Sequence, residues 1–246
     1  MKILVCVSKA PDTTSKIAFT DNNTKFDNDK VTYIVNPYDE WYALVRALEL
    51  KEANGGTVTT ITVGEAADDA LIRKALAVGA DDAVRINAPA TDAFFVANEI
   101  ANYAKENGFD LVLAGKETID YNSGEVGPMV AELMDVASVS LVSNLEVSGT
   151  TAKAERDIPG GVEVVEFELP AVVTAVKGLA EQRIPNMRGI MQARTKPLKV
   201  VEPSSNETLT EVVEYALPPA KGDCKYIDAD NMEELVNLLH NEAKVI

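Results

Sequence analysis

Histidine and cysteine are scarce in this sequence. Its 246 residues include one histidine, His240, and two cysteines, Cys6 and Cys224. A single histidine excludes a metal site of several histidines. Its place near the end of an apolar C-terminal segment also argues against a histidine-based catalytic triad. The cysteines show neither zinc-site spacing nor a disulfide framework. Cys6 lies within an apolar run, where a buried thiol that packs in the core is the simplest interpretation.

Positive charge is also scarce. Asp and Glu number 39 against 23 Lys and Arg, which gives a formal net charge of −16. We therefore expect no nucleic-acid partner, because phosphate backbones require a concentrated basic face. No apolar run approaches the roughly 18 residues that a membrane-spanning helix needs, so direct membrane insertion is not expected. No targeting segment precedes the first strand-like run, and we expect a cytoplasmic protein.

What is present is an alternation of short β-rich runs and helical patterns. Thr91 is expected to cap one of the helices, and Gly108 to end it. Strands separated by helices of this length predict βαβ units, so the fold class is α/β, with a mostly parallel, Rossmann-like sheet flanked by helices. The expected strands are 2–7, 57–64, 83–87 and 110–115, and the expected helices are 38–56, 68–81 and 91–108.

The pattern changes after about residue 137. Further β-rich runs follow, which we expect to form antiparallel additions to the sheet. A polar segment comes next, in which Met187, Ile190 and Met191 fall on one side of a short helix. The additional strands are expected at 138–149, 151–158, 161–169 and 171–176.

The end of the sequence contains linker-like stretches and then an apolar helical stripe. Asp230 and Glu233 have the spacing of a capping box ahead of that stripe. We expect an α/β nucleotide-binding domain over 1–200, which includes segment 183–193, and an extended C-terminal arm over 201–246. The helix of the arm is expected to pack on another chain, because its apolar stripe would otherwise be exposed.

A polar, glycine-containing loop follows the run at 110–115 and leads into a helical pattern. Ligands of open α/β sheets bind beyond the carboxyl ends of the strands, and the free N–H groups of a helix start attract anions. Glycines let a backbone approach a ligand closely, a serine hydroxyl can donate to phosphate, and Pro128 fits a first helical turn. The pattern predicts a phosphate-binding loop whose key residues are Asp120, Asn122, Ser123, Gly124 and Gly127.

The residues alone leave an alternative open, namely a plain strand-to-helix connection with capping residues. Neither GxGxxG nor GxxxxGK[ST] occurs, so no dinucleotide fingerprint or P-loop can be claimed. Ser123 has no base partner in view, and no GxSxG elbow is present. We expect no catalytic residues and no bound metal.

Several segments match one known family in order and spacing. They are "LVCVSKAPDT", "VNPYDEWYALVRALELKE", "IRKALAVGADDAVRI", "DLVLAGKETIDYNSGEVGPMVAEL", "ERDIPGGVEVVEFELPAVVT" and "RIPNMRGIMQARTKPL". Over nearly its whole length, the chain resembles the beta subunit of electron transfer flavoproteins, and the expected sheet is then of the adenine-nucleotide-binding type.

The resemblance implies a non-enzymatic subunit that pairs with a larger alpha subunit, which carries most of the FAD contacts. The heterodimer takes electrons from flavin dehydrogenases and passes them to an acceptor such as a quinone oxidoreductase. In carrier-type relatives the beta subunit holds AMP. In bifurcating relatives, which oxidise NADH, a second FAD takes that place. A stand-alone adenine-nucleotide-binding domain is a further alternative, without support from a phosphate-binding lysine motif.

The resemblance also assigns site residues. The family's AMP contacts correspond to the end of the first strand, the "NP" segment, the end of the second strand and the polar loop. The corresponding residues are Cys6, Asn36, Pro37, Tyr38, Asp39, Val63, Asp120, Tyr121, Asn122, Ser123, Gly124, Glu125, Val126, Gly127, Pro128, Met129, Val130 and Ala131.

Segment 183–193 resembles the family's recognition loop for dehydrogenases. Met187 falls at its protruding apolar position, and Arg188, Ile190 and Met191 accompany it. Glu163 matches an acid that pairs with the mobile flavin domain of the alpha subunit in carrier-type relatives.

The chain departs from the family pattern in places. Thr13 stands where some relatives have a tyrosine near the flavin, and Pro159 replaces an acid before a glycine pair. "PDTT" at 11–14 is closer to bifurcating relatives, whereas "GGVE" at 160–163 is closer to the carrier type. Because the charge of Glu163 lies at a domain contact, we expect AMP rather than a second FAD.

Overall fold

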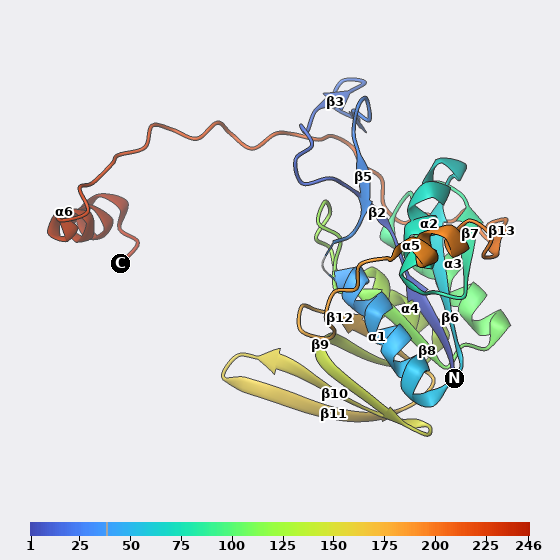
Figure 1. Cartoon of the computed structure of the whole chain (residues 1–246). Coiled ribbons are helices and arrows are strands. Elements are labelled where there is room, and N and C mark those ends of the chain that lie inside the picture. The colour runs from blue at the N-terminus through green and yellow to red at the C-terminus, as the bar shows by residue number, and fades with distance from the viewer. Residues whose placement is uncertain (38) are drawn as a thin grey trace.

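The computed structural model describes residues 1–37 and 39–246. Its centre is a nine-stranded sheet in the order β11-β10-β9-β12-β8-β1-β6-β7-β13 (Figure 1). The strands from β9 through β12, β8, β1, β6 and β7 to β13 run parallel, and β10 and β11 add an antiparallel hairpin. The mostly parallel α/β class is confirmed. The strands are β1 (Lys2–Cys6), β6 (Thr57–Gly64), β7 (Asp82–Asn87), β8 (Leu111–Gly115), β9 (Ala137–Ser148), β10 (Thr151–Ile158), β11 (Gly161–Glu168), β12 (Ala171–Ala175) and β13 (Leu198–Val201).

Helices cover both faces of the sheet. The strand residues alternate between two apolar clusters: in β1, Ile3 and Val5 face one cluster, and Leu4 and Cys6 face the other. Helices α1, α2 and α5 pack on the first face, and α3 and α4 on the second. A parallel sheet needs such cover, because its strands are apolar on both sides. The helices are α1 (Asp39–Asn54), α2 (Asp69–Val78), α3 (Ala93–Asn107), α4 (Val126–Met134) and α5 (Met187–Ala193), with a 3-10 turn over Ala66–Asp68.

Several details differ from the sequence-based expectations. β12 is parallel to both of its neighbours, β8 and β9, so the expectation of an antiparallel strand at β12 was wrong. The same expectation holds for β9 only on the side of β10, because β9 runs parallel to β12. The N-cap of α3 is Asp92 and not Thr91, because the Asp92 side chain accepts from the N–H of Phe95 at 2.7 Å. Gly108 ends α3 in the left-handed region, as predicted. β13 was not predicted as a strand.

Two small antiparallel ribbons stand beyond the sheet between β1 and α1. They were not predicted, because each of their strands has only two or three residues. Figure 1 shows them at the end of the domain where the C-terminal arm departs. Their strands are β2 (Lys9–Pro11) with β5 (Tyr33–Val35), and β3 (Phe19–Thr20) with β4 (Lys25–Phe26).

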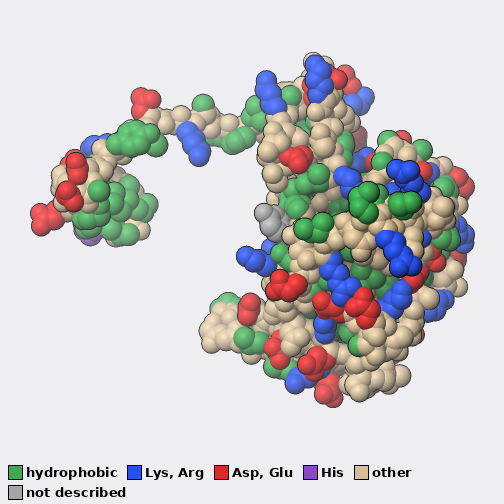
Figure 2. All heavy atoms as spheres, in the orientation of Figure 1, with side chains coloured by type: hydrophobic (Ala, Val, Ile, Leu, Met, Phe, Trp, Pro, Cys, Tyr) green, Lys and Arg blue, Asp and Glu red, His purple; other side chains and the backbone are tan. Residues whose placement is uncertain are grey.

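The C-terminal arm leaves the domain after β13 and ends in helix α6 (Met232–Asn237), which a π-helical segment, Leu238–Ala243, continues. Figure 2 shows hydrophobic side chains gathered on this terminal helix, apart from the domain. The expected capping box is displaced by one residue, because Asn231 caps α6 by accepting from the N–H of Glu234. None of the helices that the structure describes has the length and hydropathy of a membrane span.

Candidate functional site

The candidate site lies at the carboxyl ends of β1, β6 and β8. From β1 the chain passes through α1 to β6 on one side, whereas β8, on the other side of β1, is reached from β7 through α3. In open α/β sheets, such a reversal of strand order leaves a crevice where ligands bind. The strand ends at Cys6 and Val63, and the loop after Gly115, all lie at this edge of the sheet.

The loop between β8 and α4 is fixed at its base and turns sharply at its tip. The N–H of Lys116 donates to the carbonyl of Ala175 at 3.0 Å, and the N–H of Asn122 donates to the carbonyl of Thr118 at 2.9 Å. Asn122 and Gly124 have φ angles of 53° and 65°. Asparagine and glycine are the residues that tolerate this left-handed conformation best, which explains their place here.

Helix α4 begins directly after the loop and packs closely on the sheet. A Cβ at Gly127 would lie 2.3 Å from Cγ2 of Thr174, so only glycine permits this approach. Pro128 is the third residue of the helix, within the first turn, as the sequence predicted. The N–H groups of a first turn have no partner within their helix, so those of Val126 and Gly127 can bind an anion.

The structure divides the expected nucleotide contacts into three groups by their exposure. The buried residues face the protein interior and, apart from the unpartnered side-chain oxygen of Asn36, can contact a ligand only through their backbone. Exposed residues are Asp120, Tyr121, Asn122, Ser123, Glu125 and Pro128, half-buried ones are Pro37, Val63, Gly124, Val126 and Met129, and buried ones are Cys6, Asn36, Asp39, Gly127, Val130 and Ala131. Tyr38 lies outside the described residues.

Asn36 links the segment before α1 to the loop after β8. Its side chain is fully buried, and its Nδ2 donates to the carbonyl of Glu117 at 2.6 Å. Among the residues that the structure describes, its Oδ1 has no hydrogen-bond partner. A buried acceptor without a partner costs about 1–3 kcal/mol, and a ligand hydroxyl or amino group would remove that cost. Asn36 therefore offers a ready acceptor at the site.

Glu40, one residue into α1, holds the backbone beyond β1. Its carboxyl group is 5% exposed and accepts from the N–H of Ser8 at 2.7 Å and from the Ser8 hydroxyl. Burial raises its pKa to about 8, against the opposing effect of the Ser8 bonds. Burial also raises the pKa of Asp39, with Lys116 acting against it. Burial, with a smaller effect of Glu40, raises the pKa of Cys6 to about 12, so its thiol stays neutral.

The lysines at this edge of the sheet are paired with acids of the same chain. Lys9 Nζ lies 2.8 Å from Asp68, and Lys116 Nζ lies 2.8 Å from Glu117. Their charges are therefore partly neutralised before any ligand binds. Recognition of a phosphate here would rest mainly on backbone N–H groups and the exposed hydroxyl of Ser123.

The expected docking residues lie together on a separate surface, on α5. Met187 is 74% exposed, Met191 67% and Ile190 42%, and Arg188 is exposed as well. These side chains form an apolar surface, called the α5 surface below. Clusters of exposed apolar side chains are typical of surfaces that contact other proteins.

Glu163 lies on β11 and faces Arg156 of β10 across the strand pair. The register places the two residues opposite each other, and they form an ion pair through Arg156 Nε. Both side chains remain more than a third exposed. The carboxylate of Glu163 thus already has a partner in this chain, and its outer side stays open to solvent.

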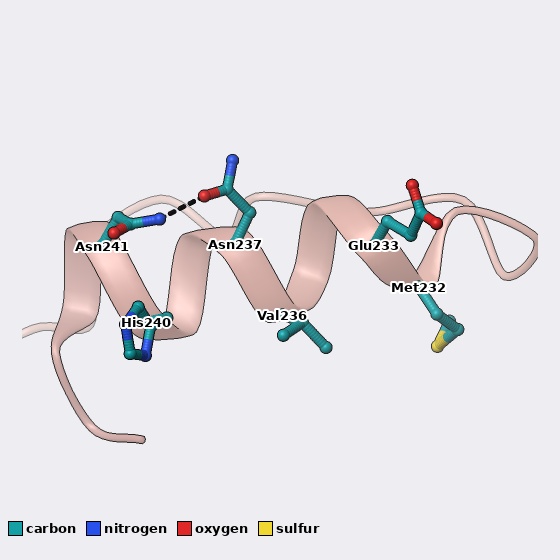
Figure 3. Close-up of a pocket in the computed structure, with 6 residues that line it drawn as sticks. All are labelled: Met232, Glu233, Val236, Asn237, His240 and Asn241. Carbon is teal, nitrogen blue, oxygen red and sulfur yellow. Dashed lines mark hydrogen bonds between the residues drawn. The ribbon is translucent and has the colours of Figure 1, made fainter.

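The structure also contains a shallow apolar face on the terminal helix. Figure 3 shows Met232, Val236 and His240 pointing to one side of α6 and its continuation, with Asn237 on the other side. All six lining residues come from this one helix, so the face is open and far from the candidate site. We assign it no small ligand.

Sequence reasoning missed several residues that build the site. The contact between Ser8 and Glu40 joins the end of β1 to the start of α1, and the carbonyl of Glu117 fixes the loop through Asn36. The local sequence around these residues does not predict these contacts. Asn36 was found only through the family resemblance, because its partner lies 81 residues further along the chain.

Comparison with known proteins decides the family. The model of the electron transfer flavoprotein domain matches residues 24–206. The beta subunit of electron transfer flavoprotein from Bacillus subtilis (strain 168) is 40% identical, with both chains covered completely. The chain belongs to the beta subunits of the electron transfer flavoproteins.

Other relatives support the same family assignment. The human electron transfer flavoprotein beta subunit is 34% identical over 82% of each chain. Subunit CarD of the caffeyl-CoA reductase-Etf complex from Acetobacterium woodii is 30% identical over 99% of this chain and 98% of its own. Membership of this family associates the chain with flavin-dependent electron transfer by a pair of subunits, and the expected family is confirmed.

Proposed function

We propose that the chain is the beta subunit of an electron-carrying heterodimer. Its alpha partner holds most of the contacts to FAD, which accepts electrons from flavin dehydrogenases and passes them to an acceptor such as a quinone oxidoreductase. Full-length similarity to the electron transfer flavoprotein beta subunit from Bacillus subtilis (strain 168) is the observation that carries this proposal. In this scheme the beta subunit supplies surfaces and no catalytic side chain. A cytoplasmic location stays a prediction.

The candidate site holds AMP in this proposal. The first-turn N–H groups of α4 and the Ser123 hydroxyl bind the phosphate, and the buried Oδ1 of Asn36 accepts a hydrogen bond from the nucleoside. When bound, AMP supplies no redox chemistry and acts as a fixed part of the structure. The free N–H groups, the hydroxyl and the unpartnered acceptor fit such a ligand. Lys9 and Lys116 are paired with acids of this chain, so the phosphate contacts in this proposal are the N–H groups and the hydroxyl.

AMP is favoured over a second FAD by Glu163. The family resemblance matches this acid to carrier-type relatives, and on β11 its outer side is open to a partner while Arg156 pairs with it. The bifurcating alternative has support as well, from the "PDTT" segment and from relatives named as subunits of reductase complexes. Those relatives are 30% identical, compared with 40% for the Bacillus subtilis beta subunit.

The α5 surface docks on the dehydrogenases in this proposal. Met187 is its most exposed apolar side chain, and a flexible thioether adapts to several partner pockets. Burial of such a side chain at the centre of a contact is worth about 1–2 kcal/mol or more.

Kinetics of the full heterodimer test the docking function. Met187→Ala should raise the KM of a dehydrogenase for the heterodimer roughly fivefold to thirtyfold, the equivalent of about 1–2 kcal/mol, while the FAD content stays unchanged. The matched control is Ile17→Ala, which shortens another exposed apolar side chain away from α5. An unchanged KM for Met187→Ala would count decisively against docking through this surface.

A further inference from the structure

Helix α5 is too short to be stable by its own hydrogen bonds. It has seven residues, and isolated helices shorter than about 12 residues are marginal in water. Its apolar side chains at Met187 and Met191 are mostly exposed and Ile190 is 42% exposed, so they contribute little burial to hold it. Its order must come from contacts on the side that faces α2.

Two cations join α5 to α2 in a reciprocal way. Nη1 of Arg73, on α2, donates to the carbonyl of Ala193 at 2.8 Å and to that of Lys196 at 2.5 Å, just beyond the end of α5. Nζ of Lys196 donates to the carbonyl of Leu76 at 2.9 Å and to that of Ala80, at the end of α2. Each helix end therefore receives a cation from the other segment, where unpaired carbonyls and the helix dipole favour positive charge.

The start of α5 is fixed by close packing and a cap. A Cβ at Gly189 would lie 2.4 Å from the carbonyl oxygen of Ala77, so α5 touches the backbone of α2. The side chain of Asn186 caps the helix by accepting from the N–H of Gly189 at 2.8 Å. These contacts set the distance between the helices, while the two cations set the position of the C-terminal end.

The approach to α5 is held by α1 as well. Nε1 of Trp41 donates to the carbonyl of Arg183 at 3.2 Å, and the guanidinium of Arg183 binds both carboxylate oxygens of Glu52 at 2.6 and 2.8 Å. The segment that carries the α5 surface is thus attached at both ends to helices of the domain.

We propose that Arg73 and Lys196 are positioning residues for docking, which hold the α5 surface in its binding geometry before a dehydrogenase arrives. The inference rests on the proposed docking function. A surface that is ordered in advance loses little conformational freedom on binding. The free energy of its side-chain contacts with the partner is therefore not reduced by the cost of ordering the segment. Neither cation has to touch the partner for this effect.

The test uses the full heterodimer with Arg73→Met and, separately, Lys196→Met. Each variant should raise the KM of a dehydrogenase for the heterodimer roughly tenfold, about 1.4 kcal/mol, with kcat and FAD content unchanged. Hydrogen exchange should increase over 187–196, and for Lys196→Met also at the end of α2, and stay as in the parent elsewhere. Lys74→Met removes the same charge from an exposed site on α2 and should change neither quantity. Lys196→Arg, which keeps hydrogen-bond donors on a long side chain, should keep most of the parent's affinity for the dehydrogenase.

The outcomes separate this inference from the docking function. A rise in KM for Met187→Ala together with a parent-like KM for Arg73→Met and Lys196→Met would overturn the positioning role alone. Higher exchange with an unchanged KM, or a higher KM with unchanged exchange, would overturn it too. If Met187→Ala itself leaves the KM unchanged, the docking function is contradicted, and the positioning role, which depends on it, is contradicted as well.

Discussion

At the scale of single residues, Glu40 shows how burial sets the charge of the candidate site. Its carboxyl group is held by Ser8 and has almost no contact with solvent, and its pKa rises to about 8 from an ordinary 4.5. The folded protein therefore keeps a proton on Glu40 at neutral pH that the unfolded chain has released. A neutral carboxyl group adds no negative charge beside a bound phosphate.

This proton predicts a pH dependence of stability. Between about pH 4.5 and 8 the folded state binds one more proton at Glu40 than the unfolded state, so its contribution falls as pH rises through that window. Glu40→Gln cannot titrate and should lose this dependence. The difference in the free energy of unfolding between parent and variant should change by roughly 1 kcal/mol per pH unit there.

Urea unfolding of the purified protein at several pH values measures this difference. A difference that stays constant across the window would show that Glu40 titrates normally in the folded protein. The comparison with the variant matters, since the chain has 39 acidic residues and other groups titrate at low pH in both proteins.

Gly124 provides a second prediction at this scale. Its φ is 65°, and a Cβ there would lie 3.3 Å from the carbonyl oxygen of Lys116, so alanine should strain the loop and shift it. Gly149 has a φ of 63° with open space around it, in the turn between β9 and β10. Alanine at either position should cost about 1–2 kcal/mol of backbone strain.

Only Gly124→Ala should lower the AMP retained by the purified heterodimer, and Gly149→Ala should retain it in full. The measurement is AMP per heterodimer after gel filtration and acid release. Equal retention by both variants would show that the loop geometry does not matter for nucleotide binding.

At the scale of elements, the sequence predicted the long regular pieces well. The expected strand 57–64 matches β6, and the expected helix 38–56 contains α1, which ends at Asn54, because apolar spacing is a local signal. β13 and the ribbon strands β2 to β5 were missed, since strands of two to four residues are too short to show a local pattern and depend on their neighbours in the sheet. The direction of β12 likewise depends on β8, which lies far away along the chain.

The site was predictable to a similar degree. Its loop and Pro128 carried local signals of a helix start, and the structure places them at the carboxyl edge of the sheet. The contacts of Asn36 with Glu117 and of Glu40 with Ser8 join segments distant in sequence. Patterns of neighbouring residues contain no information on such pairs.

The start of the C-terminal arm depends on a buried carboxylate of α3. Glu99, 2% exposed, accepts from the N–H and hydroxyl of Ser204, both at 2.8 Å, and from the N–H of Ser205 at 2.9 Å. Glu99→Gln would place an amide donor against these donors, and should cost about 1–3 kcal/mol of stability and raise hydrogen exchange over 204–205. Glu106→Gln, on an exposed face of the same helix, is the control. Equal effects of both would contradict this role of Glu99.

At the scale of the whole molecule, the C-terminal arm has two parts: one is attached to the domain, and the other ends in the exposed helix α6. The stretch around Tyr215 is attached to the domain, since its ring stacks on Phe19 at 5.0 Å and its N–H donates to the carbonyl of Asn23. Beyond it the arm leads to α6, whose apolar side chains Met232 and Val236 are about half exposed. We expect these side chains to be covered by the alpha subunit.

Truncation after Lys221 tests this expectation, because it removes α6 and keeps the attachments of the arm at Ser204, Ser205 and Tyr215. The truncated chain should keep its stability and lose most of its affinity for the alpha subunit, measured by analytical ultracentrifugation. Truncation after Val201, which also removes the attachments, should weaken both. Undiminished association of the Lys221 variant would mean that α6 does not contact the partner.

The central claim is that this beta subunit holds AMP in a one-flavin carrier. Acid release and chromatography of nucleotides from the purified heterodimer, reconstituted with excess FAD, test it most directly. We predict about one FAD and one AMP per heterodimer, with the flavin as the sole redox centre. Two FAD and no AMP, together with NADH-dependent reduction of two acceptors, would contradict the claim and identify a bifurcating flavoprotein.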